Sequence, residues 1–304
     1  MKILVTGGAG FIGSHIVDTL IDKGAKVIIL DNLKTGLIQN INEKADFVKG
    51  DILNQKLISN ILTDCDTIYH LAAFTSVPES FIKKDECISI NQVALNNILS
   101  ISSKKNIKKI ILSSSSAVYP DDKIGPFDEI SLTNPTSPYG ITKLYGEKIL
   151  KMWSKEKEVR SGISLRYFNV YGPRQEANSD YASVIPKFLN KIKQDEPIVI
   201  YGDGNQTRDY IFIDDIVNVN LLALDIQSYN CFAVGTGIEI SINQLIELIK
   251  KISNKKITIL FDSLPKGDAL RSCAKIDKIK NHGINSFVKI NDGLKMTWQS
   301  IINE

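Results

Sequence analysis

The sequence predicts an α/β protein with a doubly wound parallel sheet and a smaller C-terminal lobe. Short apolar runs rich in β-branched residues recur through the first half of the chain, as expected for strands buried on both faces. Segments with apolar residues at three-to-four spacing separate these runs, and strand–helix alternation is typical of a parallel sheet with right-handed crossovers. A glycine-rich turn, TGGAGFIG at residues 6–13, joins the first run to the first helical segment.

The elements of the first half can be placed in order along the chain. The expected strands are Lys2–Thr6, Lys26–Leu30, Asp46–Lys49, Thr67–Leu71, Lys108–Ser113 and Gly162–Arg166. Helical patterns cover Phe11–Lys23 and Asn91–Lys104. A further helix begins in SPYGITK, residues 137–143, because Ser137 is a favoured N-cap and Pro138 a favoured first helical residue.

After Tyr171 the alternation loosens, which indicates a second lobe. An irregular loop is expected at 172–181, a helix at Val184–Lys193, a strand at Ile198–Tyr201 and a helix at Ile242–Ile252 with Ser241 as its N-cap. We therefore expect one domain over residues 1–171 and a second lobe formed mainly by residues 172–304. Strands within 208–235 are in a position to return to the first sheet.

The composition is that of an ordinary globular protein, with 304 residues, 43% of them hydrophobic and 23% charged. A net charge of +3 does not favour a nucleic-acid or membrane partner. We expect a cytoplasmic protein with reduced thiols, since no signal peptide, no apolar run of roughly 18 residues and no CxxC pair is present. His15, His70 and His282 lack the spacing of metal ligands, so no metal site is expected.

The glycine-rich turn is typical of a dinucleotide site. Gly7 and Gly10 let the backbone turn tightly and approach a pyrophosphate, and Gly13 lets the first helix pack closely on the sheet. The amides and positive dipole end of that helix attract the phosphates. Asp51 and Ile52 follow the third strand, where an adenine would lie, and HLAA (70–73) ends the fourth strand beside the expected path of the cofactor.

Asp31 favours NAD over NADP. It ends the second strand, 18 residues beyond Gly13, where a carboxylate can accept hydrogen bonds from both hydroxyls of the adenosine ribose. It would repel a 2′-phosphate, and the stretch DNLKTG, residues 31–36, contains no arginine to accommodate one.

Tyr139 and Lys143 form a candidate catalytic pair. They lie four residues apart on one predicted helix and so share a face. A free tyrosine has a pKa of about 10, and about 4 kcal/mol of preference for the phenolate would bring it near neutrality. The Lys143 ammonium and a positive nicotinamide both have the sign that this requires. Tyr139 can then take a proton from a sugar hydroxyl.

Together these motifs resemble the extended short-chain dehydrogenase/reductase family, in particular its NAD-dependent nucleotide-sugar epimerases and dehydratases. The resemblance rests on TGGAGFIG, DNL, GDI (50–52), HLAA, Asn91, SSSSAVY, YGITK, RYFNVYGPRQ (166–175) and RDYIFIDD (208–215). It implies a Rossmann domain that binds NAD over residues 1–171 and a lobe that mainly binds a nucleotide sugar over 172–304. It also implies a homodimer, through helices near Asn91–Lys104 and Lys143–Trp153.

The resemblance also assigns roles to individual positions. The implied cofactor-binding residues are Gly7, Gly10, Phe11, Ile12, Gly13, Asp31, Asn32, Leu33, Lys34, Thr35, Gly36, Asp51, Ile52, Leu71, Ala72, Ala73, Thr75, Asn91, Tyr139, Lys143, Tyr167 and Val170. The implied substrate-binding residues are Ser76, Ser115, Tyr139, Asn169, Tyr201, Arg208, Arg271 and Ser272. Among the latter, Arg208 suits the diphosphate because its guanidinium can clamp phosphate oxygens.

The serine run at 113–116 separates the reactions of the family. Ser115 lies four residues before Tyr119, and Ser116 and Ala117 stand where the related 4,6-dehydratases carry a carboxylate for elimination. The resemblance then implies epimerisation at C4 of UDP-glucose and UDP-galactose through a 4-keto intermediate, with Ser115, Tyr139 and Lys143 as catalytic residues. Three alternatives stay open: 4-epimerisation of UDP-N-acetylglucosamine or UDP-glucuronate, a keto-sugar reductase, and a non-enzymatic NAD-sensing protein.

The family pattern breaks in the C-terminal lobe. The sequence reads PKGD at 265–268, with Pro265 where related proteins have an arginine, so Lys266 or Arg271 is left to supply the diphosphate cation. Ser272 falls where 4-epimerases carry a residue that limits the size of the sugar 2-substituent. A small side chain there is similar to proteins that accept N-acetylated sugars.

Overall fold

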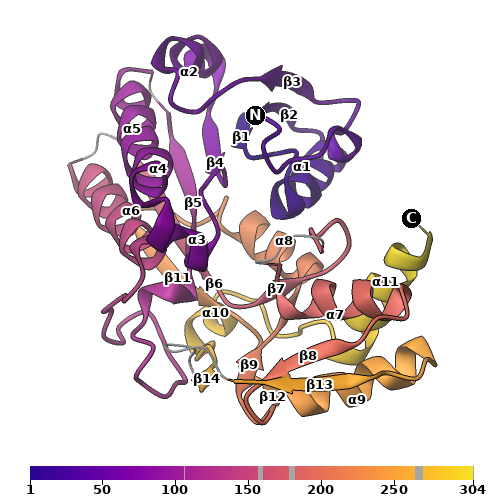
Figure 1. The fold of residues 1–304 in the computed structure, drawn as a ribbon. Coiled ribbons are helices and arrows are strands. Elements are labelled where there is room, and N and C mark those ends of the chain that lie inside the picture. Colours follow the sequence, from indigo (N-terminus) through magenta and orange to yellow (C-terminus); the bar gives the residue numbers. More distant parts are fainter. Residues whose placement is uncertain (106, 157–159, 178–181, 264–269, 304) are drawn as a thin grey trace. The chain divides into compact units, whose positions relative to one another are not determined.

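The computed structural model describes residues 1–105, 107–156, 160–177, 182–263 and 270–303 (Figure 1). Within these residues the main sheet has seven strands in the order β11–β6–β5–β4–β1–β2–β3. They are β1 (Lys2–Thr6), β2 (Lys26–Asp31), β3 (Asp46–Lys49), β4 (Thr67–His70), β5 (Lys109–Ser115), β6 (Ser161–Tyr167) and β11 (Asn230–Val234). The pairs β1–β2, β2–β3, β1–β4 and β4–β5 are parallel, and the predicted α/β fold is confirmed.

The strand order reverses direction at β1. The chain proceeds from β1 outward to β2 and β3, then returns to place β4 and β5 on the other side of β1. In open α/β sheets such a reversal leaves a crevice at the carboxyl ends of the two central strands, and ligands bind there. The glycine-rich turn follows β1 and the HLAA segment follows β4, so both lie at this edge.

Helices cover the sheet and bury its apolar residues. The helices of the first half are α1 (Phe11–Asp22), α2 (Gln55–Ile61), α3 (Val77–Ile82), α4 (Lys84–Ile88), α5 (Ala94–Lys104) and α6 (Pro138–Lys155). Figure 1 shows α5 and α6 side by side, next to β4 and β5. One core cluster joins Ile58 of α2, Ile98 of α5 and Leu150 of α6 to strand residues such as Leu4 and Ile68.

The start of α6 follows the expected capping chemistry, whereas the start of α5 does not. The Ser137 hydroxyl accepts a hydrogen bond from the Gly140 amide at 3.0 Å, and Pro138 is the first residue of α6. The predicted helix over Asn91–Lys104 differs from the structure, because α5 begins only at Ala94 and a π-helical segment, Ser89–Val93, precedes it. Asn91 lies within this wider turn, and its buried side-chain amide bonds to Phe74 and Thr142.

The remaining elements form small sheets and helices. They are β7 (Val170–Tyr171), α7 (Val184–Lys193), β8 (Ile198–Tyr201), β9 (Thr207–Asp209), β10 (Ile211–Phe212), α8 (Ile213–Leu222), β12 (Glu239–Ser241), α9 (Ile242–Ser253), β13 (Ile259–Asp262), β14 (Arg271–Ser272), α10 (Asp277–Asn281) and α11 (Ile290–Asn303). The predicted α7 and β8 are confirmed at both ends. Ser241 is the N-cap of α9 and forms a capping box. Its hydroxyl accepts from the Gln244 amide, and Gln244 Oε1 accepts from the Ser241 amide.

The chain divides into two compact units. The first comprises residues 1–118, 132–166 and 217–232, and the second comprises 119–131, 167–216 and 233–304. The assignment of cofactor binding to 1–171 and substrate binding mainly to 172–304 stays a prediction. In the part of the chain that the structure describes, no helix is both long and apolar enough to cross a membrane.

Candidate active site

The turn after β1 has the geometry of a phosphate-binding loop. Gly7 has φ +72°, and a Cβ at this position would lie 2.7 Å from the Ala72 amide nitrogen. A Cβ on Gly13 would overlap the Gly7 carbonyl oxygen, so both positions exclude larger residues. The first bond of α1 runs from the Ser14 amide to the Gly10 carbonyl, which leaves the amides of 11–13 at the end of the helix for an anion.

Asp31 is fixed at the end of β2. Its side chain is buried, with Oδ2 accepting from the Ala9 amide at 3.0 Å and Oδ1 from the Leu33 amide at 2.9 Å. A carboxylate has about four acceptor positions, so these two bonds leave capacity for ribose hydroxyls. Leu33 takes φ +60° to make its bond, and the Gly36 backbone passes beside the carboxylate. The turn is built around the Asp31 carboxylate.

Three other residues of this turn lie at the surface, and the two predicted residues after β3 differ in their exposure. Asn32, Lys34 and Thr35 are exposed, and Lys34 forms an ion pair with Glu86. The Asp51 carboxylate accepts from the Leu53 amide at 2.8 Å, whereas Ile52 is buried in the core.

The segment after β4 is tied back to β1 at its start. The amides of Leu71 and Ala72 both donate to the Thr6 carbonyl. Ala73 is partly buried and Thr75 is exposed. Ser76 is the N-cap of α3, where its hydroxyl accepts from the Glu79 amide at 3.2 Å. The structure therefore gives the Ser76 side chain a capping bond, and its predicted contact with substrate stays a prediction.

Asn91 joins three parts of the first unit. Its Oδ1 accepts from the Phe74 amide at 2.8 Å, and its Nδ2 donates to the Phe74 carbonyl at 3.1 Å and to Thr142 Oγ1 at 2.9 Å. The side chain thus ties the loop after β4 to α6. These bonds use most of the amide's capacity, so Asn91 orders the surrounding backbone.

Ser115, Tyr139 and Lys143 come together where β5 ends beside α6. The Ser115 hydroxyl donates to the Tyr139 phenol oxygen and accepts from the Ala117 amide at 3.1 Å. Lys143 Nζ lies 5.7 Å from the centroid of the Tyr139 ring and donates to the Ser113 carbonyl at 2.8 Å. A substrate hydroxyl bound at the phenol would meet a second hydroxyl at hydrogen-bonding range.

Burial opposes the charged form of both ionisable groups. It raises the pKa of Tyr139 to about 12, although the hydrogen bond from Ser115 acts in the other direction. It also lowers the pKa of Lys143 to about 8. The chain alone therefore does not bring the phenol near neutrality. The positive nicotinamide of bound NAD would have the sign that is needed.

The residues of the first unit thus fit a dinucleotide. The turn excludes side chains at Gly7 and Gly13, the amides of 11–13 lie at the N-terminal end of α1, and Asp31 keeps acceptor capacity beside the turn. When bound, NAD supplies a carrier that accepts a hydride and returns it. The residues of this chain would hold it there and move the protons.

The second unit brings several predicted substrate residues together. Asn169 donates to the Asp209 carbonyl at 2.9 Å, and Asp209 follows Arg208 in β9. β14 pairs with β9 so that Ser272 lies opposite Arg208. Arg271 forms an ion pair with Glu239, which also accepts from Thr207 Oγ1 at 2.8 Å.

Three further predicted residues belong to other parts of this unit. Tyr201 ends β8 and is 42% exposed, Tyr167 is buried at the end of β6, and Val170 pairs with Ile211. The PKGD sequence at 265–268, with Lys266, lies outside the described residues.

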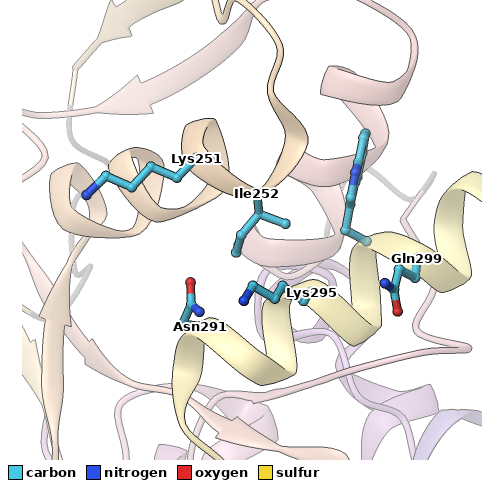
Figure 2. A pocket seen from close by; sticks show the side chains of 6 residues that line it. Lys251, Ile252, Asn291, Lys295 and Gln299 are labelled. Atoms are coloured by element: carbon cyan, nitrogen blue, oxygen red, sulfur yellow. The ribbon is translucent and has the colours of Figure 1, made fainter.

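The second unit also contains a surface pocket of about 470 Å³ (Figure 2). It is lined by Lys251 and Ile252 of α9 and by Asn291, Lys295, Trp298 and Gln299 of α11. None of the residues predicted from the sequence lines it, so it is distinct from the candidate site.

Sequence reasoning missed residues that support the pair on α6. The buried Ser80 hydroxyl accepts from the Tyr139 amide at 3.2 Å, and nothing local in the sequence connects two residues 59 positions apart. Glu147 and Arg166 form a buried ion pair. Glu147 had a signal, because it lies four residues beyond Lys143 on the same helix.

The sequence and fold match proteins of known class. The model of the NAD dependent epimerase/dehydratase family matches residues 3–235. A putative UDP-glucose 4-epimerase of Methanocaldococcus jannaschii is 40% identical over 295 residues, covering 96% of each chain.

Two solved structures share the fold throughout. The UDP-glucose 4-epimerase of Thermotoga maritima with UDP-glucose has a TM-score of 0.96 at 36% identity and covers 100% of this chain and 99% of its own. The UDP-N-acetylglucosamine 4-epimerase of Methanobrevibacter ruminantium, in complex with UDP-N-acetylmuramic acid, has a TM-score of 0.94 at 38% identity and covers 99% and 98%. The chain therefore belongs to the NAD-dependent epimerase/dehydratase family and is an NAD-dependent nucleotide-sugar 4-epimerase.

Proposed function

We propose that this 4-epimerase interconverts UDP-glucose and UDP-galactose, with Ser115, Tyr139 and Lys143 as its catalytic residues. The observation that carries the proposal is the hydrogen bond between Ser115 and Tyr139 at the carboxyl end of β5, with Lys143 one turn along the helix. Ser116 and Ala117 follow Ser115 as a short 3₁₀ turn without a carboxylate. That absence supports chemistry at one carbon over elimination across two.

The chain's residues would move one proton in each direction. Tyr139 would take the proton of the C4 hydroxyl while Ser115 holds the same oxygen, so that C4 becomes a ketone as its hydride passes to the carrier that bound NAD would supply. Lys143 stabilises the phenolate by its charge. After the 4-keto sugar turns over, Tyr139 returns the proton to the oxygen as hydride is added to the opposite face of C4. The inverted hydroxyl is the product.

The cofactor and diphosphate contacts are part of the same proposal. The turn at 6–13, the 31–36 segment with Asp31, and the 71–75 segment would hold NAD. In the second unit, Asn169 and Arg208 would meet the diphosphate, since they are linked through Asp209. Arg271 forms an ion pair with Glu239, which competes with a phosphate for its guanidinium.

UDP-N-acetylglucosamine is the second candidate substrate. Ser272 is a small residue opposite Arg208 in the β9–β14 pair, and such a residue leaves room for a sugar 2-substituent. The structure from Methanobrevibacter ruminantium is of a UDP-N-acetylglucosamine 4-epimerase at 38% identity. UDP-glucuronate remains the third candidate. Its extra charge lies at C6 and leaves the C4 hydroxyl in place.

Incubation with each of the three UDP-sugars tests these proposals. Purified protein, with bound NAD verified by absorbance after denaturation, is given UDP-glucose, UDP-N-acetylglucosamine or UDP-glucuronate without added cofactor. The products are separated by chromatography, and the conversion of UDP-glucose to UDP-galactose should have the largest kcat/KM of the three reactions. A larger value for UDP-N-acetylglucosamine would transfer the assignment to that sugar, and the Ser272→Tyr variant should then lose it selectively.

We also propose a homodimer through α5 and α6. Val93, Ile141 and Met152 are exposed apolar residues next to or on these helices, at 46%, 50% and 44% exposure. Burial of such residues against a second copy would stabilise the pair. Sedimentation should give a mass near twice 33.8 kDa, and an Ile141→Lys/Met152→Lys variant should sediment as a monomer.

A further inference from the structure

A buried ion pair lies beside the proposed catalytic residues but outside their chemistry. Glu147 of α6 and Arg166 of β6 expose only 4% and 6% of their side chains. Arg166 donates from Nη2 to Oε2 at 2.7 Å and from Nε to Oε1 at 2.9 Å, and the Ser114 hydroxyl donates to Oε1 at 2.5 Å. Apolar residues of the same volume are often as stabilising as a buried pair, so stability alone does not account for it.

The position of Glu147 links it to the reaction. It lies one turn beyond Lys143 and two turns beyond Tyr139 on one face of α6. Its partner Ser114 stands on β5 between Ser113, whose carbonyl accepts from Lys143, and Ser115, which bonds to Tyr139. The carboxylate therefore joins the helix and the strand that carry all three groups.

We propose that Glu147 is a positioning residue for the epimerase, which keeps Lys143 in its ammonium form and holds α6 against the end of β5. This rests on the proposed roles of Ser115, Tyr139 and Lys143. Arg166 fixes the carboxylate by two bonds, so that the negative charge stays in place while the substrate changes.

The charges around Lys143 support this assignment. Besides Tyr139, the titratable groups facing the ammonium are Cys87 from α4, His70 from β4 and Glu147 from its own helix. Burial raises the pKa of the Cys87 thiol and lowers the pKa of His70 to about 3, so both are neutral at pH 7. Glu147 is then the anion that opposes the effect of burial on Lys143. Arg166 and Tyr229 face Glu147 in turn.

The pH dependence of turnover tests the proposal. Glu147→Gln combined with Arg166→Met removes both charges of the pair together, so neither member is left buried without the other and the double variant should stay folded. Its high-pH limb of kcat should nevertheless move down by about one unit, with kcat about fivefold lower at pH 8 and KM unchanged. Glu147→Asp, which keeps the charge, should keep the wild-type limb.

Lys109→Met is the matched control. Lys109 is a buried lysine at the opposite end of β5, where its ammonium donates to the carbonyls of Ala223 and Ile226 at 3.0 and 2.8 Å. This variant should lose stability, and the high-pH limb of its kcat should stay at the wild-type position. A folded double variant with an unmoved limb would overturn the proposal, because the ion pair would then be structural only.

A second measurement works without turnover. The Lys143 side-chain resonance in ¹³C-lysine-labelled protein, assigned by Lys143→Arg, should titrate about one pH unit lower in the double variant. An unchanged titration overturns the role of Glu147 even if the enzyme is active. If none of the three UDP-sugars is epimerised, the proposed function fails separately, and the resonance still decides whether Glu147 controls Lys143.

Discussion

At the scale of residues, the candidate site contains a fixed carboxylate, Asp31, and two buried ionisable groups, Tyr139 and Lys143. Asp31 is held by two backbone amides, so it meets a ligand without rearrangement. Tyr139 and Lys143 are different, because burial raises the pKa of one to about 12 and lowers the pKa of the other to about 8. In the proposed mechanism, their protonation states depend on the charge of bound NAD and on the charge of Glu147.

Replacement of Tyr139 by phenylalanine tests its role as the base. Tyr139→Phe removes the group that accepts the proton, and general acid–base catalysis typically contributes 10²–10⁴-fold. We expect a loss of kcat of that order with bound NAD retained, measured by epimerisation assays and by absorbance after denaturation. Tyr145→Phe is the control on the same helix, since Tyr145 bonds to Asn96. Near-normal turnover by Tyr139→Phe would show that another group is the base.

His70 predicts a loss of stability in acid. Burial lowers its pKa in the folded chain to about 3, from 6.5, so below pH 6.5 the unfolded chain binds a proton that the folded chain does not. The free energy of unfolding should therefore fall as pH falls, by roughly 2 kcal/mol between pH 7 and pH 5 from this group.

Urea titrations at the two pH values measure this loss. The His70→Gln variant should lose less stability than wild type by that amount, and the exposed His282→Gln should behave as wild type. Equal losses in wild type and His70→Gln would contradict the assignment.

At the scale of elements, α6 is the helix on which the site depends. Its start is fixed by the Ser137 cap, two residues before Tyr139. Ser137→Ala should cost about 1 kcal/mol in the free energy of unfolding and should also lower kcat, because Tyr139 lies in the first turn. Ser241→Ala in α9 should cost a similar amount without changing kcat. Denaturant melts and initial rates measure both, and equal effects on kcat would contradict the difference.

The sequence predicted elements well where the signal was local. The start of α6 and both ends of α7 and β8 were predicted correctly, because caps, proline and apolar spacing act within a few residues. The π-helical turn at Ser89–Val93 was not predicted, since it depends on bonds that Asn91 makes to Phe74 and Thr142. The Ser80–Tyr139 bond is non-local in the same way.

The site could be predicted only in part, because some of its features are local in the sequence and others depend on contacts between distant residues. The glycine turn and the spacing of Tyr139 and Lys143 are readable along the chain, whereas the pairing of Ser272 with Arg208 requires β14 to meet β9. Burial, which sets the directions of the pKa shifts, is likewise a property of the folded chain alone.

At the scale of the whole molecule, cofactor binding should couple to stability. A ligand that binds only the folded chain stabilises it by an amount that grows with its concentration over Kd. Protein freed of NAD should therefore melt at a higher temperature when NAD is added. Asp31→Ala loses the charged acceptor for the ribose and should weaken NAD binding about 10- to 100-fold, whereas the exposed Asp46→Ala should not. An equal change in NAD affinity in the two variants would contradict the role of Asp31.

The proposed reaction oxidises one carbon, C4 of the sugar, and then reduces it again with the same hydride. UDP-glucose deuterated at C4 tests this most directly, with holoenzyme in ordinary water, no added cofactor and product analysis by mass spectrometry and NMR. We predict UDP-galactose that keeps the deuterium at C4, because the hydride leaves and returns within one active site. UDP-galactose that has lost the deuterium to solvent would be incompatible with this reaction, as would the absence of any C4-inverted product from this substrate, UDP-N-acetylglucosamine and UDP-glucuronate.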